Sequence, residues 1–156
     1  MDDTKNSDLG RIRDSYPFFL VGNAGDCKQL WVKVDAGWHR NYETALGWVA
    51  YDENGCRIFE GGLKIKAESA LQAEAMGIQK VLIWACERDI LHLDLSSDYL
   101  QLVTQLAGLA RPNHLIGGLM EDIFRIGARF HCLCFSYLPR KLNKIAHSLA
   151  CEAMRL

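Results

Sequence analysis

Between residues 29 and 65 the apolar residues fall in short runs typical of strands. The runs at 30–36 (LWVKVDA), 44–52 (TALGWVAYD) and 56–65 (CRIFEGGLKI) are rich in β-branched and aromatic residues. The tripeptide ENG at 53–55 is a tight-turn signal between the last two runs. We therefore expect three strands joined by short turns in an antiparallel meander.

From about residue 67 onward, helical spacing of the apolar residues alternates with strand-like runs. The expected elements are a helix at 67–89, a strand at 90–97, helices at 98–108 and 114–130, a strand at 130–138 and a helix at 142–154. The order βββαβααβα implies crossover connections and parallel neighbours. It predicts an α/β domain over residues 29–156, built on a five-stranded mixed sheet.

The first 28 residues have a different pattern, broken by glycines and Pro17, with a single apolar segment at 16–21. We expect a loose N-terminal leader that can dock this segment. Within the domain, three tryptophans are assigned to the core: Trp31, Trp48 and Trp84. The last helix is expected to bury Leu142, Ile145, Ala146, Leu149 and Ala153.

The charge balance and the apolar content of the chain narrow the classes of function that it can have. A chain of 156 residues with 18 basic and 19 acidic side chains is close to neutral, which argues against a bulk polyanion binder but leaves room for a local basic patch. The polar start is unlike a signal peptide, and no apolar run approaches the roughly 20 residues of a membrane span. The six cysteines are expected to be free thiols, and Cys132 and Cys134 should share one strand face. We expect an intracellular protein, nuclear or cytoplasmic, without a membrane partner.

Three acidic residues lie where the pattern predicts burial or a strand end. Asp35 ends the first strand of the meander, and Glu74 is in line with the sheet-facing residues of the first long helix. Asp98 ends the fourth strand. Two of them have a simpler interpretation alone: Glu74 as an acid at the edge of the apolar stripe, and Asp98 as a helix cap. Asp94, deeper in the same strand, has no firm assignment.

Taken together, the three acids predict a cation site. Ligand sites in such sheets lie outside the carboxyl ends of the strands. Clustered carboxylates repel one another unless a cation neutralises them, and oxygen ligands suit Mg²⁺ or Mn²⁺. Two such ions about 3.5–4 Å apart commonly catalyse displacement at a phosphodiester.

Four motifs then resemble a known family in order and spacing. They are VKVDAGW at 32–38, ESALQAEAMGIQKVL at 68–82, SSDYLQLV at 96–103 and YLPRKLNKIAHSLA at 137–150. Together they resemble the ribonuclease H-like superfamily, in particular the plant-expanded, reverse-transcriptase-like ribonuclease H domain family. The resemblance covers roughly residues 30–155.

The resemblance implies the ribonuclease H-like fold, with strand order 3-2-1-4-5, the second strand antiparallel to its neighbours, and helices on both faces of the sheet. It implies a metal-dependent hydrolase that cleaves the RNA strand of RNA–DNA hybrids. It points to Asp35, Glu74 and Asp98 as ligands of Mg²⁺ or Mn²⁺, and it places His147 at the family's fourth acidic position, as a catalytic residue and a metal ligand.

A histidine in place of an acid changes the expected metal chemistry. His147 brings no negative charge, and its nitrogen suits Mn²⁺ better than Mg²⁺. We therefore expect a weak second metal position and weak activity.

Family enzymes often carry a basic segment between the middle helices, whereas residues 106–118 here hold only Arg111 and His114. Binding to the hybrid should accordingly be weak and salt-sensitive. Tyr137 stands where this group commonly has His.

Four further residues are candidates for substrate binding, each with a simpler alternative. Arg140 and Lys144 either contact phosphates or are solvated charges at a helix start. Trp38 either stacks on the nucleic acid or packs in the domain. Asn143 either contacts substrate or orients the last helix.

The sequence leaves three hypotheses open. The first is a ribonuclease H-type endonuclease, as a monomer or as part of a larger assembly. The second is a catalytically degenerate domain that binds nucleic acid, and the third is an interaction module derived from a retroelement.

Overall fold

The computed structural model describes residues 18–22, 25, 27–108 and 116–156. Its strands are β1 (Phe18–Gly22), β2 (Gln29–Trp38), β3 (Glu43–Tyr51), β4 (Arg57–Lys66), β5 (His92–Ser97) and β6 (Cys132–Tyr137). Its helices are α2 (Ala70–Glu87), α3 (Leu100–Leu106), α4 (Gly117–Gly127), the short 3₁₀ turn η2 (Arg140–Leu142) and α5 (Lys144–Met154). All of the strands and helices predicted from residue 29 onward are present, with small shifts at their ends.

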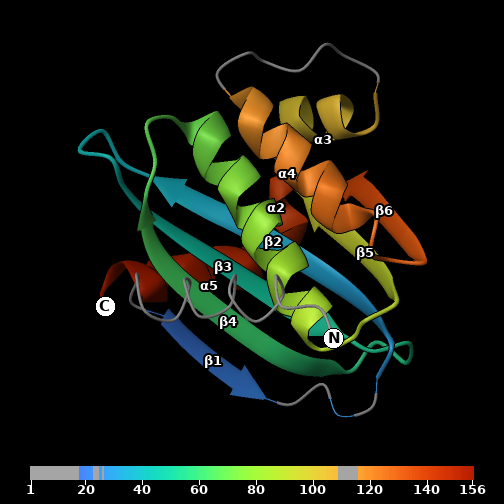
Figure 1. Ribbon diagram of the computed structural model, residues 1–156. Helices are drawn as coiled ribbons and strands as arrows, with labels where there is room; N and C mark the ends of the chain where they lie inside the picture. The colour runs from blue at the N-terminus through green and yellow to red at the C-terminus, as the bar shows by residue number, and fades with distance from the viewer. Residues whose placement is uncertain (1–17, 23–24, 26, 109–115) are drawn as a thin grey trace.

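The strands form one mixed sheet in the order β1-β4-β3-β2-β5-β6 (Figure 1). β3 pairs antiparallel with both β2 and β4, whereas β2, β5 and β6 run parallel. The five predicted strands therefore have the predicted order and directions. The prediction that Asp35 ends its strand is wrong, because β2 continues to Trp38 in pairing with β3. The parallel pairing of β2 with β5 does end there, at Val34 opposite Ser97, so the next residue of each segment, Asp35 and Asp98, lies at the same place on the sheet.

The sheet has six strands rather than the predicted five, because Phe18–Gly22 pairs antiparallel with β4. Opposite this segment β4 carries Gly61 and Gly62, and Phe19 is in register with Gly62. A side chain at Gly62 would come within 2.3 Å of the Phe19 ring, so the glycine leaves the space in which that ring packs. The apolar segment of the expected leader thus extends the sheet at its β4 edge.

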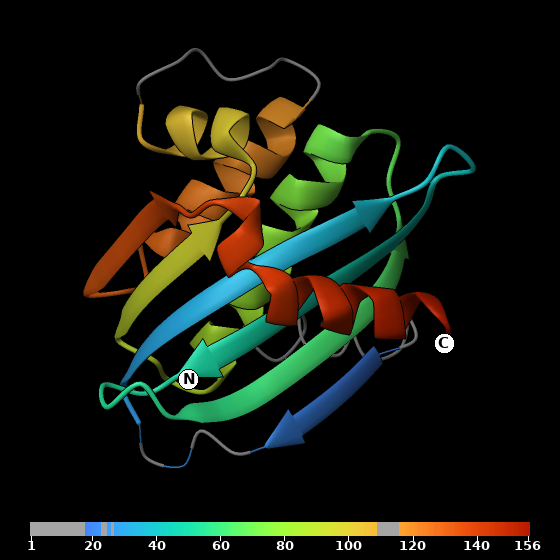
Figure 2. The same cartoon turned by 180° about the vertical axis from the view of Figure 1, so that it is seen from behind.

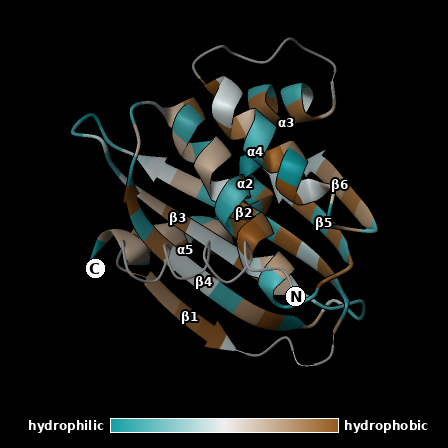
Figure 3. Cartoon of the chain, viewed as in Figure 1, coloured by the Kyte–Doolittle hydropathy of each residue, from teal (hydrophilic) through white to brown (hydrophobic). Residues whose placement is uncertain are grey.

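Helices cover both faces of the sheet. α2 packs against β2 and β3, and α4 packs on α2 (Figure 1). α5 lies on the opposite face, across β2, β3 and β4 (Figure 2). In Figure 3 much of the sheet behind α2 is coloured as hydrophobic, in keeping with a core of fully buried residues such as Leu30, Leu46 and Leu82.

α5 approaches β3 unusually closely because β3 has glycine at position 47. A Cβ there would lie 2.3 Å from the carbonyl oxygen of Ala146 and 2.4 Å from the amide nitrogen of Ala150. Only a residue without a side chain fits this contact. The contact fixes where the helix begins, and with it the positions of Asn143 and His147.

Two predictions of burial are wrong on this face. Trp31 is 36% exposed, whereas Trp48 and Trp84 are buried as predicted. Trp31 points to the α5 side of the sheet at the end of β2 that is farther from the helix. On α5 itself the buried residues are Ala146, Leu149, Ala150 and Ala153, while Leu142 and Ile145 are exposed. Leu142 precedes the helix in η2, so the helical spacing assumed for it does not apply.

Among the described residues, no helix is long and apolar enough to cross a membrane.

Candidate active site

Three carboxyl groups converge at the place where the pairing of β2 with β5 ends. Asp35, Glu74 and Asp98 each offer an oxygen, and these oxygens all lie within 4.8 Å of one another. Asp35 comes from β2, Glu74 from α2, and Asp98 from the turn after β5. Among the described residues, they are the one group of three or more acidic, histidine or cysteine side chains so placed.

The simpler interpretation of Glu74, an acid at the edge of the apolar stripe reaching water, is wrong. Glu74 is only 5% exposed, and its Oε2 is buried without a hydrogen-bond partner. Its place is set by the start of α2, where Ser69 Oγ accepts a hydrogen bond from the Gln72 amide and the Gln72 side chain accepts one from the Glu68 amide. Glu74 therefore faces the sheet and points at the other two acids.

The capping interpretation of Asp98 is also wrong. α3 begins at Leu100, and no side chain caps its N-terminus. The turn is instead held by Ser97, whose Oγ accepts a hydrogen bond from the Tyr99 amide at 3.1 Å. The Asp98 carboxylate is thus left to face Asp35, and its Oδ2 accepts a long hydrogen bond of 3.4 Å from Asn143 Nδ2.

Burial and mutual repulsion both favour the protonated forms of Glu74 and Asp35. Burial raises the pKa of Glu74 well above its usual value, and the nearby charges of Asp35 and Asp98 raise it further. Burial also raises the pKa of Asp35; its hydrogen bond to His147 opposes the rise, and the charge of Asp98 adds to it. The cluster therefore needs either protons or a cation.

The cluster fits a hard divalent cation. It offers only oxygen atoms, which are the ligands that Mg²⁺ and Mn²⁺ prefer. The unpartnered Oε2 of Glu74 is a buried acceptor that a cation would satisfy, at a site where an uncompensated charge is costly. Asp35, Glu74 and Asp98 are the residues that could hold the ion.

His147 adjoins the cluster. Its Nδ1 lies 2.9 Å from Asp35 Oδ2, a distance at which the ring N–H donates a hydrogen bond to the carboxylate. The side chain is 64% exposed, so it stands at the mouth of the site. An ion shared by His147 and Asp35 has to replace this hydrogen bond, because Nδ1 is the ring nitrogen that faces the acid.

Of the four candidates for substrate binding, two have contacts that favour a structural role. Asn143 is 1% exposed, and its Nδ2 donates to the Val34 carbonyl at 2.9 Å, so it orients the start of α5 against β2. Trp38 donates from Nε1 to the Ala67 carbonyl at 2.8 Å, which fixes the end of β2 against the segment before α2. These contacts favour the orienting and packing interpretations over a contact with substrate.

The other two candidates, Arg140 and Lys144, are exposed beside the cluster. The charge of Arg140 opposes the rise in the Glu74 pKa, so it acts on the site electrostatically. Tyr137 is 46% exposed. Arg111 and His114, in the segment between the middle helices, lie outside the described residues.

Three residues of the site were not predicted. Lys33 Nζ donates to the Leu142 carbonyl at 3.3 Å. Burial raises the pKa of Tyr99, and the nearby charge of Glu74 raises it further. Cys151 Sγ is 3.6 Å from His147 Nε2. Lys33 precedes Asp35 by two residues, and Cys151 follows His147 by four, so strand and helix spacing already place both on the faces of the site.

Comparisons with known proteins agree with this fold. A family model described as reverse transcriptase-like matches residues 33–153. No curated protein matches the sequence. Among solved structures, RNase H1 from the halophilic archaeon Halobacterium salinarum aligns with a TM-score of 0.77 at 24% identity, covering 81% of this chain and 98% of that one.

Two further solved structures have the same fold. The N-terminal RNase H domain of a Mycobacterium tuberculosis protein aligns with a TM-score of 0.72 at 20% identity, over 81% of this chain and 94% of that one. LC11-RNase H1, solved in complex with an RNA/DNA hybrid, aligns with a TM-score of 0.68 at 19% identity, over 81% of this chain and 97% of that one.

Proposed function

The chain belongs to the reverse transcriptase-like family of the ribonuclease H-like superfamily, and from this premise we propose that it is a metal-dependent endonuclease that hydrolyses the RNA strand of RNA–DNA hybrids. The observation that carries the proposal is the convergence of Asp35, Glu74 and Asp98 within 4.8 Å at the carboxyl ends of two parallel strands. A structural neighbour solved with an RNA/DNA hybrid supports the substrate class.

The three acids would hold Mg²⁺ or Mn²⁺, and such an ion supplies the positive charge that stabilises an attacked phosphodiester. The buried carboxyl of Glu74 fixes one side of the site, because α2 holds it against the sheet. Asn143 holds the start of α5 against β2, which sets the distance between Asp35 and the exposed residues before the helix.

Three exposed or half-buried cations lie at or near the mouth of the site and are suited to the phosphates of a substrate: Lys33, Arg140 and Lys144. Phosphate contacts of this kind set affinity without reading sequence. Since the net charge of the chain is −1, the remaining surface adds little attraction, and binding should weaken steeply with salt.

His147 is proposed as the ligand of a second, weaker metal position. Its hydrogen bond to Asp35 must be given up for that role, which adds to the preference of its nitrogen for Mn²⁺ over Mg²⁺. The same hydrogen bond favours the second candidate function, a degenerate domain that binds nucleic acid without cutting it, because it occupies the ring nitrogen that the second ion would need.

An assay on a hybrid labelled in its RNA strand, with Mg²⁺ and Mn²⁺ in parallel, tests the proposal. We expect cleavage of the RNA strand, stronger in Mn²⁺, and none of single-stranded RNA or duplex DNA of the same sequence. Binding of hybrid without cleavage in either ion would favour the degenerate domain. Neither binding nor cleavage would favour an interaction module.

A further inference from the structure

Two thiols lie side by side on the edge strand β6, away from the acidic cluster. The sulfur atoms of Cys132 and Cys134 are 4.0 Å apart, and both residues are exposed. They share one face of the strand because side chains two residues apart point the same way. The two side chains lie on the same face of the sheet as α5. On this face α5 covers β2, β3 and β4, and Figure 2 shows that it leaves β5 and β6 open.

The spacing of the two sulfurs suits one metal ion better than a disulfide. A disulfide requires the sulfurs to approach to about 2.05 Å with a strongly bent linkage, which an extended strand opposes. Two thiolates that bind one tetrahedral ion at about 2.3 Å each are separated by roughly 3.8 Å. The observed separation is close to that value, so little movement of either side chain is needed.

Further donors face the same pair from the neighbouring strand. His92 is in register with Cys132, and Asp94 is in register with Cys134. The contact with Cys132 is the main cause that raises the pKa of the Cys134 thiol, and the charge of Asp94 adds to it. The ring of His131 lies 6.0 Å from that of His92. These side chains have no place in the proposed nuclease site, which lies at the carboxyl ends of β2 and β5.

We propose that Cys132 and Cys134 bind a soft or borderline divalent ion such as Zn²⁺, with His92 rotating in as a third ligand from β5. Thiolate and imidazole select ions of this class, whereas the all-oxygen cluster at Asp35 selects hard ions. The two sites therefore differ in the metals they take. An ion that bridges β6 and β5 would tie the edge strand to the strand that leads into Asp98.

Titration of the reduced, metal-free full chain with Co²⁺, followed by its displacement with Zn²⁺, tests this site directly. Thiolate-bound Co²⁺ has a near-ultraviolet charge-transfer absorption that oxygen-bound Co²⁺ lacks. We expect that absorption to saturate at one equivalent and to disappear when Zn²⁺ is added. The double variant Cys132→Ser/Cys134→Ser should lose it, and His92→Ala should weaken Co²⁺ binding about tenfold or more, the usual scale for the loss of a metal-site partner.

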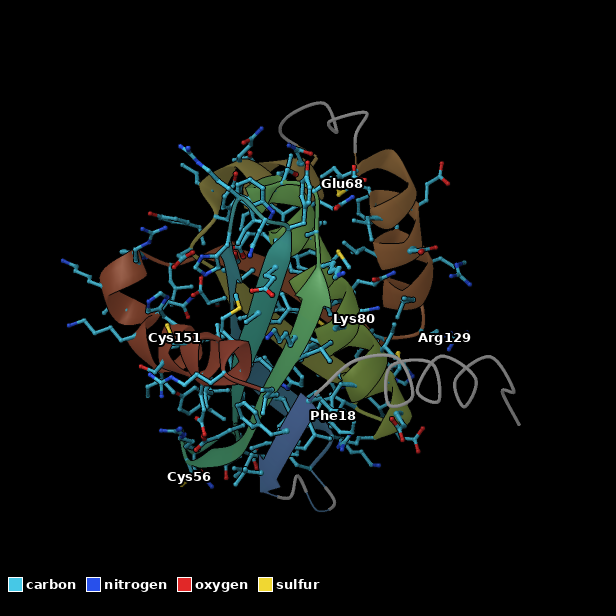
Figure 4. All side chains as sticks on the ribbon, turned by 90° about the vertical axis from the view of Figure 1, so that its left-hand side faces the viewer. Phe18, Cys56, Glu68, Lys80, Arg129 and Cys151 are labelled. Atoms are coloured by element: carbon cyan, nitrogen blue, oxygen red, sulfur yellow. The ribbon has the colours of Figure 1, made fainter. Side chains whose placement is uncertain are left out.

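The matched control is Cys56→Ser/Cys151→Ser, which removes two other exposed thiols, one before β4 and one on α5 (Figure 4). This variant should keep the absorption. If it loses the absorption while the β6 double variant keeps it, the ion binds at Cys56 or Cys151 and the proposal fails. Absence of the absorption from the parent chain also overturns it. Far-ultraviolet circular dichroism of the double variant and of the single variant Cys134→Ser shows whether each is still folded. It therefore tells whether the absorption is lost with the site or with the fold.

Discussion

The imidazole of His147 lies 2.9 Å from Oδ2 of Asp35, so the last helix contacts the first acid of the cluster. The contact joins residues 112 positions apart in the chain. It depends on the close approach of α5 to β3 at Gly47 and on the anchoring of Asn143 to Val34. Because this pair joins a buried acid to an exposed histidine, it determines how the metal chemistry of this chain should differ from that of an all-acid site.

Replacement of His147 should therefore change the metal preference. We expect the parent to have low activity in Mg²⁺ with partial rescue by Mn²⁺, and His147→Asp to gain activity in Mg²⁺ because it restores a hard oxygen ligand. Parallel assays in both ions measure this. If His147→Asp and His147→Ala both match the parent in either ion, His147 is a bystander.

The activity that depends on His147 should also fall with acidity. An imidazolium ion cannot coordinate a metal, so the Mn²⁺-supported rate should decline as the solution is acidified. The rate of His147→Asp, measured in Mn²⁺ over the same range, is the control. The prediction fails if the two profiles superimpose.

Asp35→Asn should abolish cleavage and leave the metal-free fold as stable as the parent or more so. The substitution removes one of three clustered negative charges, and with it repulsion that raises the Glu74 pKa. Thermal unfolding without divalent ions measures the stability. A melting temperature well below that of the parent would show that Asp35 is structural.

Glu74→Gln should stabilise the metal-free chain in a pH-dependent way. The folded-state pKa of Glu74 is raised, so between its unfolded and folded pKa values the folded state holds more protons than the unfolded state. The stability of the parent therefore falls as pH rises from about 4, where the unfolded carboxyl ionises. At pH 8 the variant should be more stable by an amount on the order of 1–3 kcal/mol, because glutamine carries no charge to be buried beside Asp35 and Asp98.

Denaturant unfolding at pH 4 and pH 8 checks this prediction, and the advantage of the variant should shrink at the lower pH. Equal free energies of unfolding for parent and variant at both pH values would contradict the buried, unpartnered state of Glu74. Addition of Mn²⁺ at pH 8 should stabilise the parent and not the variant.

Most of the fold could be predicted from the sequence, because strand and helix periods are strong between residues 29 and 154. The strand β1 was not predicted, since five residues after a glycine- and proline-broken segment do not reveal that Gly61 and Gly62 leave space for Phe19. Trp31 was misplaced for a related reason: hydrophobicity does not show how far a covering helix extends across a sheet.

The acidic cluster could be predicted because each acid breaks a local pattern. The contacts that hold it could not. Asn143 donates to a backbone carbonyl 109 residues away, and Lys33 reaches a carbonyl just before α5. Such contacts depend on the angle between α5 and the sheet, which no short-range spacing encodes.

Gly47→Ala tests the contact that sets this angle. The added methyl would overlap the backbone of α5, so we expect a loss of about 1–3 kcal/mol in the free energy of unfolding, typical of overpacking. The control is Gly118→Ala in α4, where a Cβ meets no other atom within 4 Å and the helix should tolerate or gain from alanine. Equal effects of the two substitutions would contradict the close approach.

The central claim, that Asp35, Glu74 and Asp98 jointly hold a divalent cation, is tested most directly by calorimetric titration of the chain with Mn²⁺ at pH 8. We predict saturable binding by the parent and loss of the tight site in Glu74→Gln, with Cys132→Ser/Cys134→Ser as a control that leaves Mn²⁺ binding unchanged. Mn²⁺ binding that is absent from the parent, or equal in parent and Glu74→Gln, would contradict the claim.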